Sequence, residues 1–174
     1  MMTYSVYLGG ALFDYKQLVG NAILAETLHK RSKGQYTCVL PQDFEQTSNR
    51  AADIRNKDLR KLIACDLGLF NFDGTELDSG TVVEFIIAKA LDIPTVILRS
   101  DFRASGDQGQ GNDDWNLMCS FFPRVRKIQF NAMAWYQDAF STDESKDTWP
   151  ERLYNRIADA ILVQLNTVRT DPSS

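Results

Sequence analysis

Short apolar runs alternate along this chain with longer segments whose apolar residues recur at helical spacing. Strict alternation of strands and helices is typical of right-handed βαβ crossovers, which place the strands parallel in one sheet. The sequence therefore predicts an α/β fold with a doubly wound sheet of about five parallel strands and helices on both faces. The expected strands span residues 4–8, 36–40, 67–72, 95–98 and 126–130, and the expected helices span residues 15–31, 50–64, 81–91 and 149–165.

The length of 174 residues suits one domain with a core of ordinary size. We expect residues 1–174 to form that single domain, with a polar tail at about residues 166–174. The loop at residues 100–114 carries three glycines, and loops of this length are usually functional or mobile. The aromatic segment at residues 115–122 that follows is interpreted as core or subunit interface, because apolar side chains in a loop need covering.

Glycines and polar residues follow the predicted strands. Gly9 and Gly10 follow the first strand, Gln42 and Asp43 the second, and the acidic and glycine-rich run at residues 73–80 the third. In a doubly wound sheet the carboxyl ends of the strands meet at one edge, and ligands bind there. We therefore expect these segments to converge on one site.

Two carboxylates occupy positions where helical spacing predicts apolar residues. Glu84 shares a helix face with Ile87, Ala88 and Leu91, and Asp58 shares one with Ile54, Leu62 and Cys65. Asp78 adds a third acid close to Glu84. Like charges held close together raise at least one pKa, which gives the mixture of protonated and ionised carboxyls that glycosyl transfer requires.

Each acid also has a structural interpretation. Thr81 and Glu84 have the spacing of a capping box, in which both side chains bind free amides at a helix start. Alternatively, the helix N-terminus would keep Glu84 ionised and suited to attack an electrophilic carbon. Asp58 has two interpretations. It is either a buried acid that binds backbone amides or an arginine side chain, or it belongs to the acidic cluster.

Composition and motifs exclude several functional classes. The net charge of −4 argues against nucleic acid or an anionic membrane as the main partner. The single histidine, His29, leaves little for a histidine-based triad or a zinc site, and the glycines of the loop at residues 100–114 follow neither the Walker nor the Rossmann spacing. The three cysteines are interpreted as reduced core thiols. No signal peptide or membrane span is evident, so we expect a cytoplasmic protein. We also expect no metal and no cofactor.

The chain resembles nucleoside 2-deoxyribosyltransferases from Tyr7 through about Met118. The matching elements are Tyr7-Leu8-Gly9-Gly10 at the first strand, Asp58-Leu59 on the second helix, Asp78 six residues before the nucleophilic Glu84, and Asn116-Leu117-Met118.

The resemblance implies a flavodoxin-like fold and a homo-oligomer whose subunits share active sites. The implied reaction exchanges nucleobases on 2-deoxyribose with retention, through a covalent ester on Glu84 that Tyr7 steadies. Asp58 would contact the base and move protons, and Asp78 with a neighbouring subunit's Asn116 would hold the sugar, although these two roles are interchangeable. Substrates would be deoxynucleosides and free nucleobases. Further substrate contacts are expected from Gly9, Gly10, Gln42, Asp43, Asp73, Gly80 and Met118, with the base facing residues 42–46 and the loop after the first strand.

One departure and three alternatives accompany this interpretation. Family members often end in a tyrosine whose carboxylate joins the site, whereas this chain ends in Thr-Asp-Pro-Ser-Ser. A related hydrolase of deoxynucleoside 5′-monophosphates has a serine in place of Asp78 and a cation in its first loop, so a nucleoside substrate is favoured here. Water could also attack the same intermediate and make the enzyme a nucleoside N-glycosidase. A non-catalytic nucleoside-binding module is the remaining alternative.

Overall fold

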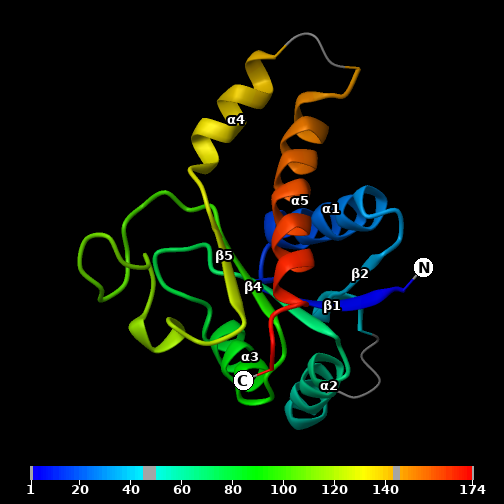
Figure 1. Ribbon diagram of the computed structural model, residues 1–174, viewed down its shortest axis with the longest axis vertical. Helices are drawn as coiled ribbons and strands as arrows, with labels where there is room; N and C mark the ends of the chain where they lie inside the picture. Colours follow the sequence, from blue (N-terminus) through cyan, green and yellow to red (C-terminus); the bar gives the residue numbers. More distant parts are fainter. Residues whose placement is uncertain (1, 45–49, 143–145, 174) are drawn as a thin grey trace.

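The computed structural model describes residues 2–44, 50–142 and 146–173. Its centre is a five-stranded sheet in the order β2-β1-β3-β4-β5, in which all neighbouring strands are parallel (Figure 1). The predicted α/β class is therefore confirmed. The strands are β1 (Tyr4–Gly9), β2 (Tyr36–Val39), β3 (Leu67–Asn71), β4 (Thr95–Arg99) and β5 (Val125–Gln129). The helices are α1 (Tyr15–Arg31), α2 (Ala51–Ile63), α3 (Ser79–Ala90), α4 (Ala132–Ser141) and α5 (Trp149–Val168), with short 3₁₀ turns η1 (Pro41–Asp43) and η2 (Leu117–Cys119).

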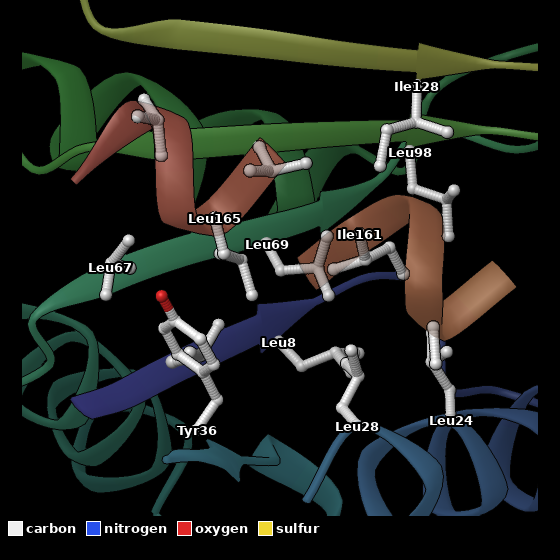
Figure 2. Packing of buried hydrophobic residues seen from close by; sticks show 14 residues of the cluster. Leu8, Leu24, Leu28, Tyr36, Leu67, Leu69, Leu98, Ile128, Ile161 and Leu165 are labelled. Carbon is white, nitrogen blue, oxygen red and sulfur yellow. The ribbon is translucent and has the colours of Figure 1, made fainter. Parts of the chain in front are cut away.

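The helices cover the two faces of the sheet and create two separate cores. On one face, buried residues of α1 and α5 pack against the strands, and Figure 2 shows Leu24 and Leu28 of α1 and Ile161 and Leu165 of α5 in this core. On the other face α2 and α3 pack against the strands, with Phe85 of α3 at the centre. Because side chains alternate along a strand, neighbouring residues of β1 and β3 belong to different cores.

Two elements differ most from the prediction. Helix α4 was not predicted, although Asn131 before it is a good cap, and its side-chain oxygen accepts a hydrogen bond from the Ala134 amide. In Figure 1 α4 lies beside the first half of α5, away from the sheet. Helix α5 continues three residues beyond the predicted end at Leu165, because Val168 is fully buried against the sheet. None of the described helices combines the length and apolar character needed to cross a bilayer.

Candidate active site

Tyr7 and Glu84 form a hydrogen bond between the sheet and α3. The hydroxyl of Tyr7, which is fully buried on β1, donates to Oε1 of Glu84 over 2.8 Å. Alternation along β1 points Tyr7 and Gly9 to the α3 face, whereas Val6 and Leu8 belong to the α1 and α5 core. The strand thus presents a phenol to the one carboxylate that α3 turns inward, as the apolar positions around Glu84 predict.

Gly9 leaves room for the second oxygen of Glu84. A Cβ atom built on Gly9 would lie 3.1 Å from Oε2 of Glu84 and 2.6 Å from the ring of Phe70. A side chain at this position would therefore displace the carboxylate or the ring. Since Oε1 accepts the Tyr7 hydrogen bond, Oε2 is the oxygen left for a ligand.

Burial raises the pKa of Glu84 to about 7. The hydrogen bond from Tyr7 opposes this shift, and the negative charges of Asp58 and Asp78 add to it. The same burial and the Glu84 carboxylate raise the pKa of the Tyr7 phenol, so Tyr7 stays protonated and able to donate. The raised pKa runs counter to the expectation that the helix N-terminus keeps Glu84 ionised at neutral pH, because burial in the core removes hydration from the carboxylate.

Asp58 lies across a cavity from Glu84. The cavity has a volume of about 510 Å³, and α2 and α3 form its walls. Burial raises the pKa of Asp58, with an opposing contribution from Lys57. Two carboxyls with raised pKa values in one cavity can divide acid and base roles between them. The cavity is lined by Ala51, Ile54, Arg55, Asp58, Leu59, Ser79, Gly80, Val83 and Glu84.

Asp78 caps α3. Its Oδ2 accepts hydrogen bonds of 2.8 Å from both the amide and the hydroxyl of Thr81. The capping-box interpretation of Thr81 and Glu84 is therefore wrong, since the helix begins at Ser79 and Glu84 lies in its second turn. Because Asp78 and not Thr81 is the cap, the helix starts about one turn earlier than the capping box implied. Glu84 therefore lies beyond the free amides of the helix start and binds Tyr7 instead. Gly80 lies at the cavity wall, where a Cβ atom would be 3.3 Å from Oδ2 of Asp78.

Asp73 and Gly10 lie away from Glu84. Asp73 lines a cavity on the α1 and α5 side. It accepts hydrogen bonds from the amides of Ser100 and Asp101 at 2.5 and 2.8 Å and from the Ser100 hydroxyl at 2.8 Å, and so joins two loops. A Cβ atom on Gly10 would lie 3.2 Å from Cβ of Asn71, so the glycine permits close contact between the ends of β1 and β3.

Of the two residues predicted after the second strand, Gln42 holds η1 in place. The Gln42 amide donates to the Leu18 carbonyl over 2.8 Å and accepts from Asn21 over 3.3 Å, which joins η1 to α1. Asp43 is exposed at the end of η1. Residues 45 and 46 of the segment expected to face the base lie outside the described residues.

Asn116 and Met118 line a second cavity, of about 600 Å³, beside the start of α3. Oδ1 of Asn116 accepts from the Met118 amide over 2.8 Å, and Met118 is 74% exposed. Ser79 and Val83 belong to the walls of both cavities, but Glu84 and Asp58 line only the first, and Asn116 and Met118 only the second. Within one chain these two pairs therefore do not face the same space.

Arg99 is a buried residue that the sequence interpretation missed. Its guanidinium donates to the carbonyls of Phe72 and Gly74 and to the hydroxyl of Ser105. The side chain is fully buried and fastens the loop that leads to α3 to the loop that leads to Asn116. The signal was available in the sequence, because a cation ends the otherwise apolar run of β4.

The described residues contain no group of three or more His, Cys, Asp or Glu side chains that could hold a metal ion. The three cysteines are free thiols, and burial raises the pKa of Cys38 to about 12 and that of Cys65 to about 11. Near the C-terminus, Asp171 forms an ion pair of 2.7 Å with Arg126 at the start of β5. This contact lies at the amino ends of the parallel strands, whereas Gly9 lies at the carboxyl end of β1.

Several solved structures share this fold. The 2-deoxyribosyltransferase of Bacillus psychrosaccharolyticus is 17% identical, with a TM-score of 0.54 and coverage of 80% of this chain and 93% of its own. The 2-deoxyribosyltransferase of Leishmania mexicana is 22% identical, with a TM-score of 0.54 and coverage of 78% of this chain and 97% of its own. The CMP N-glycosidase of Clostridium botulinum is 15% identical, with a TM-score of 0.52 and coverage of 90% of this chain and 98% of its own. At these identities the likeness establishes the fold.

No curated protein sequence is significantly similar to the chain. The family model described as "Nucleoside 2-deoxyribosyltransferase" matches residues 6–149, a range that includes Tyr7, Asp58, Asp78, Glu84 and Asn116. The resemblance seen in the sequence is thus confirmed over most of the chain, which belongs to the nucleoside 2-deoxyribosyltransferase family.

Proposed function

We propose that this protein transfers 2-deoxyribose between nucleobases and that Glu84 is the nucleophile. The hydrogen bond between Tyr7 and Glu84 at the wall of the cavity carries the proposal. It holds one carboxylate oxygen and leaves the other beside Gly9, without a partner from Tyr7, on a side chain that lines the cavity. A fixed carboxylate with one free oxygen is the arrangement that a retaining double displacement needs.

The reaction proceeds in two displacements. In the first, Oε2 of Glu84 attacks C1′ of the deoxynucleoside, the bond from C1′ to the base nitrogen breaks, and the departing base takes a proton from Asp58. In the second, a nitrogen of the incoming base attacks C1′, the ester bond to Glu84 breaks, and the base returns its proton to Asp58. The raised pKa of Asp58 suits the acid role, because it increases the protonated fraction that the first step uses.

The remaining contacts come from two chains. Oδ1 of Asp78 has no hydrogen bond to another described residue and is available to a sugar hydroxyl, while Oδ2 caps α3. Asn116 and Met118 would reach the same sugar from a neighbouring copy, since within one chain they line another cavity. The proposal therefore describes a homo-oligomer that acts in nucleoside salvage in the cytoplasm, with deoxynucleosides and free nucleobases as substrates and no cofactor.

Incubating the protein with a deoxynucleoside and a second free base, followed by chromatography, tests the proposal. We expect a new deoxynucleoside, and we expect Glu84→Gln to lower its formation by at least about a hundredfold. Glu26→Gln, which removes an exposed carboxylate on α1, is the matched control and should leave the rate unchanged. A slow fluorinated sugar analogue should leave its adduct on Glu84 in mass spectrometry. Exchange of bases by the Glu84→Gln variant at the normal rate would contradict the proposal.

A second candidate, a nucleotide N-glycosidase, is favoured by Arg55. This residue lines the cavity of Glu84, and its guanidinium donates only to the neighbouring Asn56 through Nε and one terminal nitrogen, among the described residues. A cation there could hold a 5′-phosphate, against the repulsion of Asp58 and Asp78. Release of free sugar 5-phosphate from a deoxynucleoside 5′-monophosphate, with a KM that rises in Arg55→Gln, would favour this candidate. Preference for the nucleoside, with a KM that Arg55→Gln leaves unchanged, would favour the transferase.

A further inference from the structure

A third cavity opens at the carboxyl ends of the strands, on the face opposite to Glu84. Its volume is about 370 Å³, and its walls come from α1, α5 and the ends of β3, β4 and β5. Leu24 of α1 and Leu98 of β4 line it, and Figure 2 shows both at the same end of the core. A space of this size can hold a ring system of drug-fragment size.

The sheet separates this cavity from the cavity of Glu84. Asn71, Asp73 and Ser100 line it, while Phe70, Phe72 and Arg99, which alternate with them along the chain, point to the other face. No residue lines both cavities. A molecule bound here would therefore leave the space around Glu84 free.

Gly20 leaves part of this cavity open at the cost of helix stability. Glycine is a poor helix former, yet Gly20 lies in the middle of α1. A Cβ atom on Gly20 would meet the Tyr154 hydroxyl at 3.5 Å, an ordinary van der Waals contact, so packing does not require a glycine. A longer side chain would enter the cavity that Gly20 lines.

Hydrogen-bond donors without partners surround the cavity. Among the described residues, the hydroxyl of Tyr154 and the side-chain NH₂ groups of Asn71 and Gln17 have no hydrogen-bond partner. The carboxylate of Asp73 is occupied by three donors from Ser100 and Asp101. Lys16 lines the rim and is exposed. The cavity therefore offers free donors to a ligand that brings acceptors, with the positive charge of Lys16 at the rim and the negative charge of Asp73 neutralised in part by its three donors.

We propose that this cavity is a second binding site and that it takes a small aromatic carboxylate. The flat apolar body would lie between Leu24, Leu98 and the apolar side chains Phe130, Leu153 and Ile157, and the carboxylate would accept hydrogen bonds from the donors at the rim. Burial raises the pKa of the Tyr154 phenol, so this group stays a neutral donor.

Titrating the full chain with 2-naphthoate and following the amide resonances by NMR tests the proposal. We expect saturable shifts centred on Gly20, Ser100 and Tyr154, and a dissociation constant at least about tenfold larger in Gly20→Leu, whose side chain fills the cavity. Lys16→Gln should weaken the binding of 2-naphthoate but not that of the uncharged 2-naphthamide. Val19→Leu, at an exposed position on the same helix, is the matched control and should bind as the wild type does.

Each contrary result overturns the proposal. Shifts that do not saturate, or that Gly20→Leu leaves unchanged, would remove the site, and equal binding of 2-naphthamide would remove the carboxylate specificity. Gly20→Leu should melt no lower than the wild type, because leucine favours the helix more than glycine does. If that variant does not fold, Ile157→Phe fills the same cavity from α5 and gives the same comparison.

Discussion

Glu84 must be ionised to attack a carbon atom, yet its position in the core opposes ionisation. Burial raises its pKa to about 7, and the hydrogen bond from Tyr7 is the contribution that lowers it. The phenol thus stabilises the carboxylate form without supplying a positive charge that would compete for the nucleophile. A pKa near neutrality also limits how strongly the carboxylate is stabilised before it reacts.

Tyr7→Phe should move the pH dependence of the reaction to higher pH. Since the ionised form of Glu84 reacts, its ionisation should give kcat/KM a rising limb through about pH 7 in the wild type, while loss of the Asp58 proton lowers the rate of both proteins as the pH increases. Removing the hydrogen bond raises the pKa of Glu84 further, by about one unit for a bond to a charged group. The loss of rate should therefore be largest near pH 6 and smallest near pH 9, which a pH series of initial rates measures.

Tyr36→Phe is the control for this series. Tyr36 is also fully buried and bound through its hydroxyl, to Asn166 and Arg169, but it lies in the core on the α1 and α5 face. Its loss should change stability and leave the rising limb of the pH profile near 7. A Tyr7→Phe profile that keeps the wild-type limb would show that Tyr7 does not control the ionisation of Glu84.

At the scale of elements, the start of α3 decides where the nucleophile lies. The sequence interpretation offered only Thr81 as the cap, although Asp78 is an equally good N-cap residue type. The structure uses Asp78, which also binds the hydroxyl of Thr81, and the helix begins before Thr81. Thr81 is then buried instead of exposed at the helix end.

Asp78→Ser should separate the cap of α3 from binding of the sugar. Serine can still cap the helix, so we expect little loss of stability, whereas Asp78→Ala should lower the free energy of unfolding by about 0.5–2 kcal/mol. If Oδ1 holds a sugar hydroxyl, both variants should lose activity by about tenfold or more, since a bond to a charged group contributes about 1.5–3 kcal/mol. Denaturant unfolding and steady-state kinetics measure the two effects separately.

Asp14→Ala provides the comparison for a lost cap alone. Asp14 caps α1, and its side chain accepts hydrogen bonds of 2.9 Å from the amides of Lys16 and Gln17. It does not line the cavity of Glu84. This variant should lose a similar amount of stability and keep its activity. An Asp78→Ser variant with full activity would assign Asp78 to the cap only.

The sequence predicted the elements with strong periodicity and missed features that depend on tertiary contacts. The strands and the helices α1, α2, α3 and α5 follow from apolar spacing, and the inward position of Glu84 follows from the same spacing. Helix α4 was missed because Tyr136 and Phe140 pack on one another and on Trp149 of α5, while Trp135 stacks on Phe130 beyond the end of β5. The raised pKa of Glu84 depends on packing around it that spacing does not reveal.

At the scale of the whole molecule, one buried and one half-buried side chain connect the loops that carry the site. Arg99 at the end of β4 binds carbonyls of the loop before α3, and Asp73 of that loop binds amides after β4. The connection is reciprocal, so the loop that leads to Asp78 and Glu84 and the loop that leads to Asn116 form one unit. A neighbouring subunit that contacts one loop would therefore hold both in place.

Mixing two inactive variants tests whether subunits share sites. We expect Glu84→Ala and Asn116→Ala each to be inactive as pure oligomers, because every site then lacks one of the two residues. Glu84 and Asn116 line different cavities of one chain, so a complete site would draw them from two chains. In a mixed dimer, the site that combines Glu84 of one chain with Asn116 of the other is intact. With random pairing, half of the dimers are mixed and each has one intact site, so co-expression should restore about one quarter of the wild-type activity.

The size of the restored activity distinguishes the arrangements. The control mixture combines Glu84→Ala with Val163→Ala instead of Asn116→Ala. Val163 is exposed on α5 and lies outside both cavities. That mixture should retain about half of the wild-type activity, since every site with Glu84 then has an intact Asn116. If each chain completed its own site, the mixture of Glu84→Ala and Asn116→Ala would stay inactive, because no chain would carry both residues. Restoration above background therefore requires that Asn116 reach the Glu84 of a different subunit.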